Sequence, residues 1–312
     1  MAETILIEPG KRGLTNTLRK GASLQNMSLQ IPTYKISNIT RSEDPYQLFY
    51  MTRFEEFLEN RPSLVCPHKH DFYHIIYFTN GTGVHTIDFI KYQIRKDVIF
   101  LLRPGQVHTW EFSEDVTGFA VLFSKDYYSI NDKNPNPLKE FPFFDSFKNP
   151  PYIHMNQQGY LQSDFERLLT EFESNNSFKD DLIRAIMKTI LIQLARIYQP
   201  FYEFKKGSSH LIRDYENLLD EYYRSRKTPH EYASLLNVTA NHLNAACKKF
   251  YGITAGKIIR ERIILEAKRM LVHSDQSILQ IGHYLNFEDN SYFSRFFKKY
   301  VGQSPEGFRK NQ

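Results

Sequence analysis

The chain has 312 residues, of which 41% are hydrophobic and 15% aromatic, and its formal net charge is +5 at pH 7. This length and composition accommodate two domains with a core each, and because no apolar run approaches the ~20 residues of a membrane-spanning helix, a membrane-embedded class is excluded. The two cysteines, Cys66 and Cys247, fall in different predicted domains, so no disulfide framework is expected. No apolar leader opens the chain, which predicts a cytoplasmic protein.

Residues 1–33 are polar and predict an N-terminal arm, in which Met27 offers an alternative start. Residues 34–160 are dense in Phe and Tyr, alternate in polarity and are broken by Gly and Pro, which is typical of β-structure. Strands are expected at 74–79, 84–89, 98–102, 108–112 and 118–123, with turns at 80–83 and 103–106. Short strands at such regular spacing predict a small barrel or jelly roll.

Histidines recur in this domain as His68-x-His70-x-x-x-His74, followed later by Pro104-Gly105-x-x-His108. The two stretches resemble the two motifs of the cupin fold, with His74 at the usual glutamate position. Such imidazoles bind Zn²⁺, Fe²⁺ or Ni²⁺, or they hydrogen-bond a ligand or water. We favour a small-molecule pocket without cofactor or metal, and a plain aromatic core is the other alternative. The predicted pocket comprises His68, His70, Tyr73, His74, Tyr77, Arg103, His108 and Trp110, and the alternative metal site comprises His68, His70, His74 and His108.

Residues 161–198 change to a helical period. Two apolar stripes, one from Leu161 to Phe172 and one from Leu182 to Ile197, predict a pair of helices whose apolar faces pack either on another chain or on the barrel. Residues 199–209 contain proline, glycine, lysines and serines and predict a linker.

Residues 210–312 repeat one unit twice, at about 228–250 and 277–300. Thr228-Pro229-His230-Glu231 and Ser277-Ile278-Leu279-Gln280 each predict a capping box that opens a supporting helix. Thr239 and either Glu288 or Asp289 can cap the second helix of each unit, and Gly252 and Gly302 suit left-handed helix ends. The pattern predicts two helix-turn-helix units whose second helices point Leu243, Cys247 and Phe250, or Phe293, Phe297 and Tyr300, inward.

A further amphipathic helix is expected from Ala255 to His273, between the two units. At ~1.5 Å per residue it spans roughly 28 Å, near the ~34 Å pitch of B-DNA, so both units could enter successive major grooves. Residues 210–312 also hold 16 Lys and Arg against 11 Asp and Glu, whereas residues 1–209 are neutral. This excess favours a phosphate-facing surface over solvated helix ends.

These residues resemble the AraC-type (AraC/XylS) transcription regulators. The resemblance rests on 236–243, Gly252-x-Thr254 and 262–271 in the first half, and on 281–287, 291–298 and Gly302-x-Ser304-Pro305-x-x-Phe308-Arg309 in the second half. It implies an α+β protein with a cupin-like N-terminal sensor domain and an all-α C-terminal domain that binds double-stranded DNA. It also implies that the helix pair at 161–198 carries the contact of a homodimer.

Carried over by position, the resemblance implies DNA contacts from the two second helices. Asparagine suits adenine and arginine suits guanine, whereas lysines favour phosphate. Ala245 departs from the frequent pattern, which suggests a weaker readout by the first unit. The implied DNA-binding residues are Asn241, Asn244, Ala245, Lys248, Asn290, Ser291, Ser294, Arg295 and Lys298.

The sequence thus predicts a homodimeric transcription activator that is not an enzyme. Its barrel would bind a small molecule, such as a sugar, and the resemblance implies contact with RNA polymerase. Two alternatives stay open: a constitutive DNA-binding regulator without an effector, and a metal-dependent cupin enzyme that uses the four histidines. The second leaves the repeated module unexplained.

Overall fold

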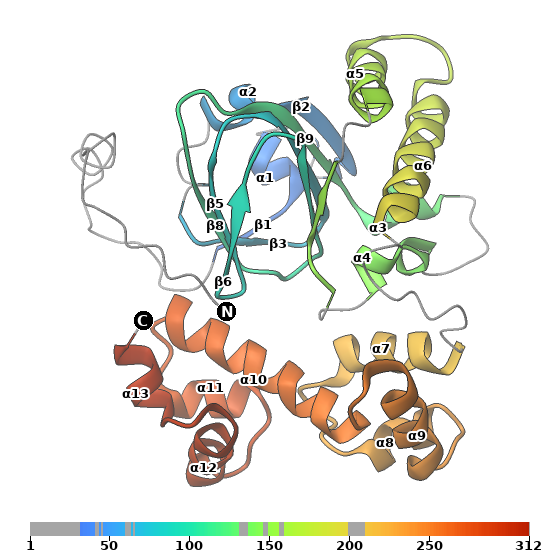
Figure 1. Cartoon of the computed structure of the whole chain (residues 1–312). Helices are drawn as coiled ribbons and strands as arrows, with labels where there is room; N and C mark the ends of the chain where they lie inside the picture. Colours follow the sequence, from blue (N-terminus) through green and yellow to red (C-terminus); the bar gives the residue numbers. More distant parts are fainter. Residues whose placement is uncertain are drawn as a thin grey trace, which may run out of the picture.

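A computed structural model describes residues 32–40, 44, 46–59, 64, 66–130, 137–145, 149–155, 159–198 and 210–311 (Figure 1). The predicted linker 199–209 and residues 1–31 of the predicted arm, Met27 included, lie outside these residues. The fold is α+β with two domains, as predicted: a β-rich N-terminal domain with flanking helices and a helical C-terminal domain.

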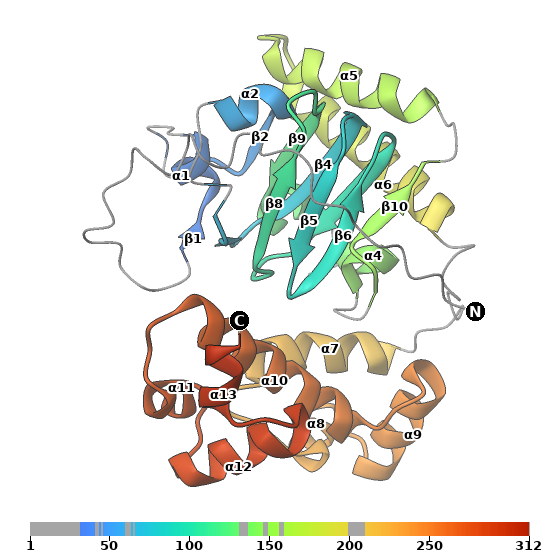
Figure 2. The ribbon, with the colours of Figure 1, turned by 60° about the vertical axis from the view of Figure 1, so that its left-hand side comes forward.

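The N-terminal domain is built from two facing sheets (Figure 2). One sheet has five strands in the order β10-β7-β4-β9-β2, and the other has three in the order β6-β5-β8. A short parallel pair, β1 with β3, adds to one end. The strands are β1 (Thr33–Tyr34), β2 (Phe49–Arg53), β3 (Lys69–His70), β4 (Tyr73–Asn80), β5 (Gly83–Ile87), β6 (Ile90–Ile94), β7 (Val98–Leu102), β8 (His108–Phe112), β9 (Thr117–Phe123) and β10 (Tyr152–His154).

The predicted strands are present, with one correction. The strand expected at 84–89 ends at Ile87, because Asp88 and Phe89 form a two-residue turn with φ of 47° and 73°. Both residues adopt positive φ, as in the type I′ turns that join right-twisted strands. The turn leads into β6, a strand that the sequence analysis did not predict.

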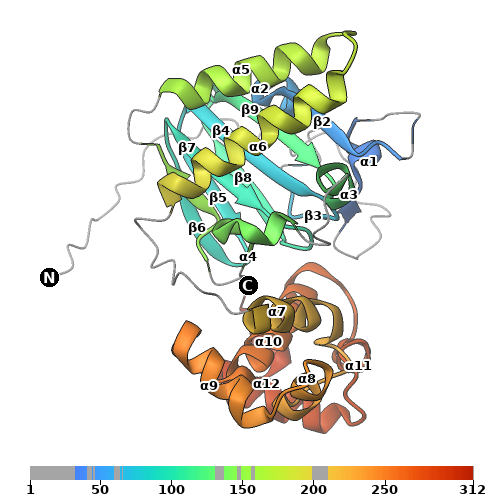
Figure 3. The same cartoon turned by 90° about the vertical axis from the view of Figure 1, so that its right-hand side faces the viewer.

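Strict alternation along β4 separates two cores. Ile76 and Phe78 lie between the two sheets, together with Trp110. Ile75 and Tyr77 point to the opposite face of the five-stranded sheet, where α5 (Gly159–Glu173) and α6 (Lys179–Tyr198) pack (Figure 3). Shorter helices complete this domain: α1 (Ile36–Thr40), α2 (Phe54–Glu59), α3 (Lys125–Ser129), η3 (Pro137–Glu140) and α4 (Pro142–Asp145).

The apolar stripes of α5 and α6 are used within the chain. Leu161, Phe165 and Leu168 on α5 and Ile190 and Leu191 on α6 are fully buried and belong to the core that includes the outer face of the sheet. The two helices therefore cover the barrel, which was the second of the two predicted roles. Any surface that they offer to another chain is their outer face.

The C-terminal domain has a single core shared by seven helices. The first, α7, donates a hydrogen bond from the Tyr215 hydroxyl to the carbonyl of Ala255 at the start of α10 (2.9 Å). The others form the two repeated units and a closing helix. Their bounds are α7 (His210–Tyr222), α8 (Pro229–Leu235), α9 (Ala240–Tyr251), α10 (Ala255–His273), α11 (Ile278–Tyr284), α12 (Asn290–Val301) and α13 (Pro305–Lys310).

The connecting helix α10 has the predicted bounds, and its apolar residues, among them Ile259, Ile263 and Ala267, are buried. It also lies toward the barrel, whereas α9 and α12 lie on the side of the domain away from the barrel (Figures 1 and 2). In the described part of the chain, no helix is both long and apolar enough to cross a membrane.

Candidate DNA-binding surface and sensor site

Both helix-turn-helix units start from the predicted capping boxes. The hydroxyls of Thr228 and Ser277 accept hydrogen bonds from the backbone N–H three residues on. In return, the side chains of Glu231 and Gln280 accept hydrogen bonds from the backbone N–H of the cap residue. These reciprocal bonds satisfy the first free N–H groups of α8 and α11. The boxes therefore fix where each supporting helix begins.

The turn inside each unit is held by an asparagine in the left-handed region. Asn237 has φ of 54° and Asn286 has φ of 56°. Asparagine is among the few residues other than glycine that adopt this conformation readily. The next residue closes the turn, since Val238 N donates to Ala233 O (3.0 Å) and Phe287 N donates to Gly282 O (2.9 Å). The same local chemistry thus sets the same turn twice.

The second helix of each unit begins at the predicted cap. Thr239 caps α9, and Asp289 rather than Glu288 caps α12 by accepting from Ser291 N (2.8 Å). The left-handed asparagine precedes the cap by two residues in the first unit and by three in the second, so the turn of the second unit is one residue longer. Both helices end at glycines in the left-handed region, Gly252 and Gly302.

Exposure repeats in register along the two second helices. Asn241 and Ser291, then Ala245 and Arg295, are exposed, and the lysine pairs that follow are exposed too. Buried apolar residues occupy the opposite face, at Leu243 and Cys247 of α9 and at Phe293 and Phe297 of α12. Of the predicted DNA-binding residues, the structure exposes Asn241, Ala245, Lys248, Asn290, Ser291, Arg295 and Lys298 and leaves Asn244 and Ser294 half-buried.

Two predicted residues have additional contacts within the domain. Asn244 Oδ1 accepts a hydrogen bond from Ala255 N (3.1 Å), which ties α9 to the start of α10. Arg295 Nη2 lies 3.6 Å from Asp289 Oδ2, so the residue that caps α12 also faces its arginine. Both side chains of this pair are mostly exposed, at 72% and 58%, and the pair is thus positioned on the surface.

One predicted core position is wrong. Tyr300, expected to point inward, is 43% exposed, whereas its counterpart Phe250 is half-buried. The Arg260 guanidinium lies over the Tyr300 ring (5.1 Å), and the edge of Phe296 contacts it (5.0 Å). A tyrosine can pack its ring while its hydroxyl stays in water, so Tyr300 lies at the edge of the buried face of α12 and not in the core.

The N-terminal domain gathers five histidines between its sheets, and each is at most 2% exposed. Their rings are close: centroids are 4.2 Å apart for His68 and His108, 5.1 Å for His70 and His108, and 5.6 Å for His70 and His74. The fifth, His85, was missed by the sequence analysis. Strand alternation could have predicted it, because His85 is two residues from Ile87 on β5 and so lies on the same buried face.

Hydrogen bonds orient four of these rings. His68 Nδ1 lies 2.8 Å from Cys66 O, and His70 Nδ1 lies 2.7 Å from Phe72 O. Since a carbonyl only accepts, each of these Nδ1 atoms carries the proton and leaves Nε2 with its lone pair. His108 Nδ1 lies 3.1 Å from His85 Nε2.

Burial keeps the cluster neutral. Loss of water lowers the pKa of His68 to about 4 and, with the neighbouring histidines adding to the effect, the pKa of His70 and of His85 to about 3. The same causes hold the pKa of His74 and of His108 well below the usual value. At neutral pH the five imidazoles are therefore uncharged, and each has one ring nitrogen that can accept a bond.

The predicted effector pocket is not one pocket, which corrects that prediction. His68, His70, His74, His108 and Trp110 lie together between the sheets. Tyr73 and Tyr77 follow the opposite parity of β4 and pack against Phe144 and Phe165 on the outer layer. Arg103 lies apart from the histidines, at a cavity between the two domains that Tyr73 also lines.

This interdomain cavity has a volume of about 230 Å³. Tyr73, Arg103 and Lys139 line it from the N-terminal domain, and Asp220, Arg262 and Arg269 line it from the C-terminal domain. Its wall is therefore rich in cations. It lies beside a set of ion pairs that crosses the domain boundary.

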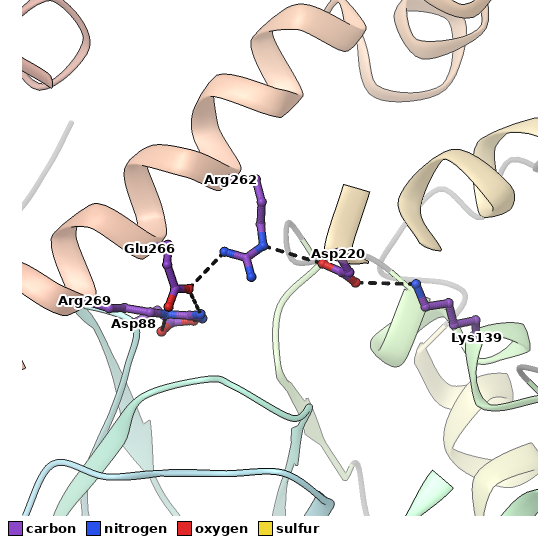
Figure 4. Close-up of polar contacts among 6 residues, drawn as sticks. All are labelled: Asp88, Lys139, Asp220, Arg262, Glu266 and Arg269. Carbon is purple, nitrogen blue, oxygen red and sulfur yellow. Dashed lines mark hydrogen bonds and ion pairs between the residues drawn. The ribbon is translucent and has the colours of Figure 1, made fainter. Parts of the chain in front are cut away.

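Figure 4 shows these ion pairs. Arg269 of α10 binds Asp88 of the β5–β6 turn with two bonds, Nε to Oδ1 (2.7 Å) and Nη2 to Oδ2 (2.6 Å). Glu266 accepts from both Arg262 and Arg269 (3.1 Å each). Lys139 and Asp220 form a second pair across the boundary (3.5 Å).

The ion pairs that Arg269 makes with Asp88 and Glu266 are shielded from water. The side chains of Arg269 and Asp88 are 6% and 14% exposed. Burial alone would raise the pKa of Glu266, but Arg269 and Arg262 outweigh it and lower this pKa. Phe89, next to Asp88, also stacks on His273 near the end of α10 (5.7 Å). The barrel thus holds α10 directly, a contact that the sequence analysis did not predict.

Two helix-turn-helix units on one core, joined to a barrel that contacts the helix between them, define a two-domain DNA-binding regulator with a sensor domain. Residues 59–191 match the family described as an AraC-like ligand binding domain, and residues 232–311 match a helix-turn-helix domain family. Together the matches span about two thirds of the chain. The chain belongs to the AraC-type transcription regulators, as its sequence motifs predicted.

Curated relatives agree in class. The HTH-type transcriptional activator RhaR of Cronobacter sakazakii is 22% identical over 255 residues, which cover 79% of this chain and 87% of that protein. The uncharacterized HTH-type transcriptional regulator YfiF of Bacillus subtilis is 22% identical over 253 residues, 78% of each chain. Among solved structures, ToxT from Vibrio cholerae covers 84% of this chain and 98% of its own at 14% identity, with a TM-score of 0.43. The C-terminal domain of the response regulator yesN from Fusobacterium nucleatum covers 30% and 93% at 27% identity, with a TM-score of 0.29.

Proposed function

We propose that this regulator is an activator that reads DNA with α9 and α12 together, and that its barrel controls how these helices are presented. One observation carries the proposal: two second helices expose the same pattern of polar residues and share one core through α10. The exposed set includes asparagine and arginine, which suit base edges, and lysines, which suit phosphate. Activation is supported by the relatives named as activators.

The barrel acts on α10 rather than on the DNA-reading residues. Asp88 and Phe89 contact Arg269 and His273, whereas α9 and α12 lie away from the barrel. Covering the readout surface is therefore not how the barrel would act. A ligand that binds one barrel conformation better would change the contacts of Asp88 and Phe89 with α10. The arrangement of the two helix-turn-helix units would change with them.

We further propose a homodimer that pairs through the outer face of α6. The exposed residues of this helix recur at helical spacing, and one of them is Ile192, which is 38% exposed. Sedimentation of the wild type and of Ile192→Glu tests this surface. The wild type should sediment as a dimer and the variant should shift toward monomer, while a wild-type monomer at all concentrations would refute it.

In the cell this activator would work in the cytoplasm and contact RNA polymerase. The regulator role explains both domains without any catalysed reaction, which disfavours the enzyme alternative. A constitutive regulator without an effector differs only in lacking ligand control. It would bind DNA equally well under all effector conditions.

The test is binding of the full chain to the DNA upstream of its own and adjacent genes, measured by fluorescence anisotropy across a salt series. Specific binding should weaken as salt rises, because phosphate contacts release counterions. Arg295→Ala should lose discrimination over random DNA, while Lys96→Ala, an exposed change between β6 and β7 of the barrel, should behave like the wild type. Equal affinity of the wild type for all sequences would refute the proposal.

A further inference from the structure

The histidine cluster has an unmet bonding requirement. The Nε2 atoms of His70, His74 and His108 are buried and lack a hydrogen-bond partner among the described residues. One ring nitrogen from each of the three lies within 4.8 Å of the others. Buried polar atoms without partners cost stability, so three of them converging in one core indicate a ligand.

We propose that His70, His74 and His108 bind one divalent transition-metal ion, and that this ion is the effector of the barrel. This inference rests on the proposed function for its regulatory part, but the site itself stands on the geometry of the cluster. The ligands come from β3, β4 and β8, so the ion would join both sheets.

The donor set selects the class of ion. Neutral imidazole suits Zn²⁺, Ni²⁺, Cu²⁺ and Fe²⁺, whereas Mg²⁺ and Ca²⁺ require oxygen ligands. Three protein ligands leave a fourth position of a tetrahedral ion for water. The close approach of the rings also disfavours a sugar among them, because the nitrogens converge on a space of atomic size.

The surroundings orient the ligands as metal sites require. His70 donates through Nδ1 to the carbonyl of Phe72, and His108 pairs through Nδ1 with His85. Histidine ligands of metals almost always donate their other ring N–H to such a partner, which fixes the ring and the tautomer. His85 is therefore a positioning residue for His108.

A short path joins the site to the DNA-binding domain. Val107 precedes His108 and exchanges two hydrogen bonds with Asp88: Asp88 N donates to Val107 O (2.9 Å), and Val107 N donates to Asp88 Oδ1 (3.2 Å). The same carboxylate holds Arg269 of α10. Zn–N bonds of about 2.0–2.1 Å hold ligand nitrogens roughly 3.4 Å apart, so binding should tighten the cluster and shift this strand end.

The first experiment titrates tag-free, metal-free full chain with Co²⁺ and Zn²⁺, using the visible absorption of Co²⁺ and calorimetry. One ion per chain is expected. His70→Gln, His74→Gln and His108→Gln should each weaken binding by more than about a hundredfold, and His85→Ala by about 10- to 100-fold. His154→Gln, which alters an exposed histidine of the same domain, is the matched control.

Thermal unfolding of the wild type tests the site independently of the variants, which could fail to fold. Zn²⁺ should raise the melting temperature of the wild type, because an ion that binds the folded state stabilises it. Circular dichroism then compares each variant with the wild type before titration. No stabilisation of the wild type, or binding that survives the three substitutions, would overturn the site.

The second experiment measures DNA affinity with and without Zn²⁺. The ion should change the affinity of the wild type at least about fivefold. Asp88→Asn should still bind the ion but lose this effect, because its contact with Arg269 is weakened. Metal binding without any change in DNA affinity would overturn the effector role. Absence of specific DNA binding in every condition would instead overturn the proposed function and leave the metal site standing.

Discussion

Arg295 is positioned by the residue that begins its helix. Asp289 caps α12 and lies 3.6 Å from the Arg295 guanidinium. Arg295→Ala should cost about 1–3 kcal/mol of discrimination at one base pair, whereas Lys298→Ala should weaken all sequences equally and reduce the salt slope by about one. Anisotropy titrations on matched and mismatched DNA measure both. An equal loss on all sequences for Arg295→Ala would contradict base readout.

Asn241 and Asn244 are both asparagines on α9, so substitutions at the two positions can be compared directly. Asn241 is exposed, but Asn244 accepts a hydrogen bond from Ala255 N. Asn244→Ala should lower the free energy of unfolding by about 1 kcal/mol, because a backbone donor loses its partner. Asn241→Ala should leave stability unchanged and weaken specific DNA binding. Urea unfolding together with DNA titration separates the two roles, and equal stabilities would refute the assignment of Asn244.

The buried histidines make stability depend on pH. Burial lowers the pKa of His85 to about 3, against an ordinary value of 6.5. Between these values the unfolded chain binds more protons than the folded chain, so the free energy of unfolding falls as pH falls below about 6.5. In metal-free protein, His85→Gln should reduce this slope by up to about 1.4 kcal/mol per pH unit. Urea unfolding between pH 6.5 and about 5 measures it, and a flat profile in the wild type would contradict a buried neutral cluster.

Residue spacing predicted part of the sensor site. The motif His68-x-His70-x-x-x-His74 and the later His108 were found because two short strands and a turn fix their separation. Tyr73 and Tyr77 were assigned to the same pocket although strand alternation sends them to the other face. Arg103 could not be placed from sequence, because its position depends on how the second domain docks.

At the level of elements, local chemistry predicted the helices well. The capping boxes, the glycine ends and the bounds of α10 all follow from residues within one turn of each boundary. The β5–β6 turn was missed because it uses Asp88 and Phe89 at positive φ without glycine. Contacts made elsewhere, including that of Asp88 with Arg269, help to hold such a turn, and a local pattern does not contain them.

The turn within each helix-turn-helix unit provides an element-level prediction. Asn237 has φ of 54°, a conformation that costs a residue such as alanine about 1–2 kcal/mol. Asn237→Ala should therefore destabilise the C-terminal domain by about that amount, while Asn237→Gly should keep the turn. Thermal unfolding of the full chain, followed by helical circular dichroism, compares them. Equal stability of the alanine and glycine variants would show that the turn does not require the left-handed conformation.

At the scale of the whole molecule, α10 contacts both the barrel and the two helix-turn-helix units. The sides of α10 pack on both repeated units, and its polar residues Arg262, Glu266 and Arg269 meet the barrel side. A change in the barrel would therefore reach both DNA-reading helices at once. Such an arrangement favours control of the geometry of binding over control of one contact.

The rigid connection between the units predicts a strict spacing in the DNA. The 19 residues of α10 span roughly 28 Å, which suits two major-groove segments on one face of the duplex. Inserting five base pairs between the segments read by α9 and α12 would turn one of them to the opposite face, so affinity should fall by at least about a hundredfold. Inserting ten base pairs should not restore it, because one helix cannot lengthen by a further ~34 Å. By contrast, a ten-base-pair insertion between the sites of two protomers returns them to the same face. Anisotropy titrations on this set of duplexes distinguish the two cases, and recovery with ten base pairs inside one protomer's site would refute a rigid α10.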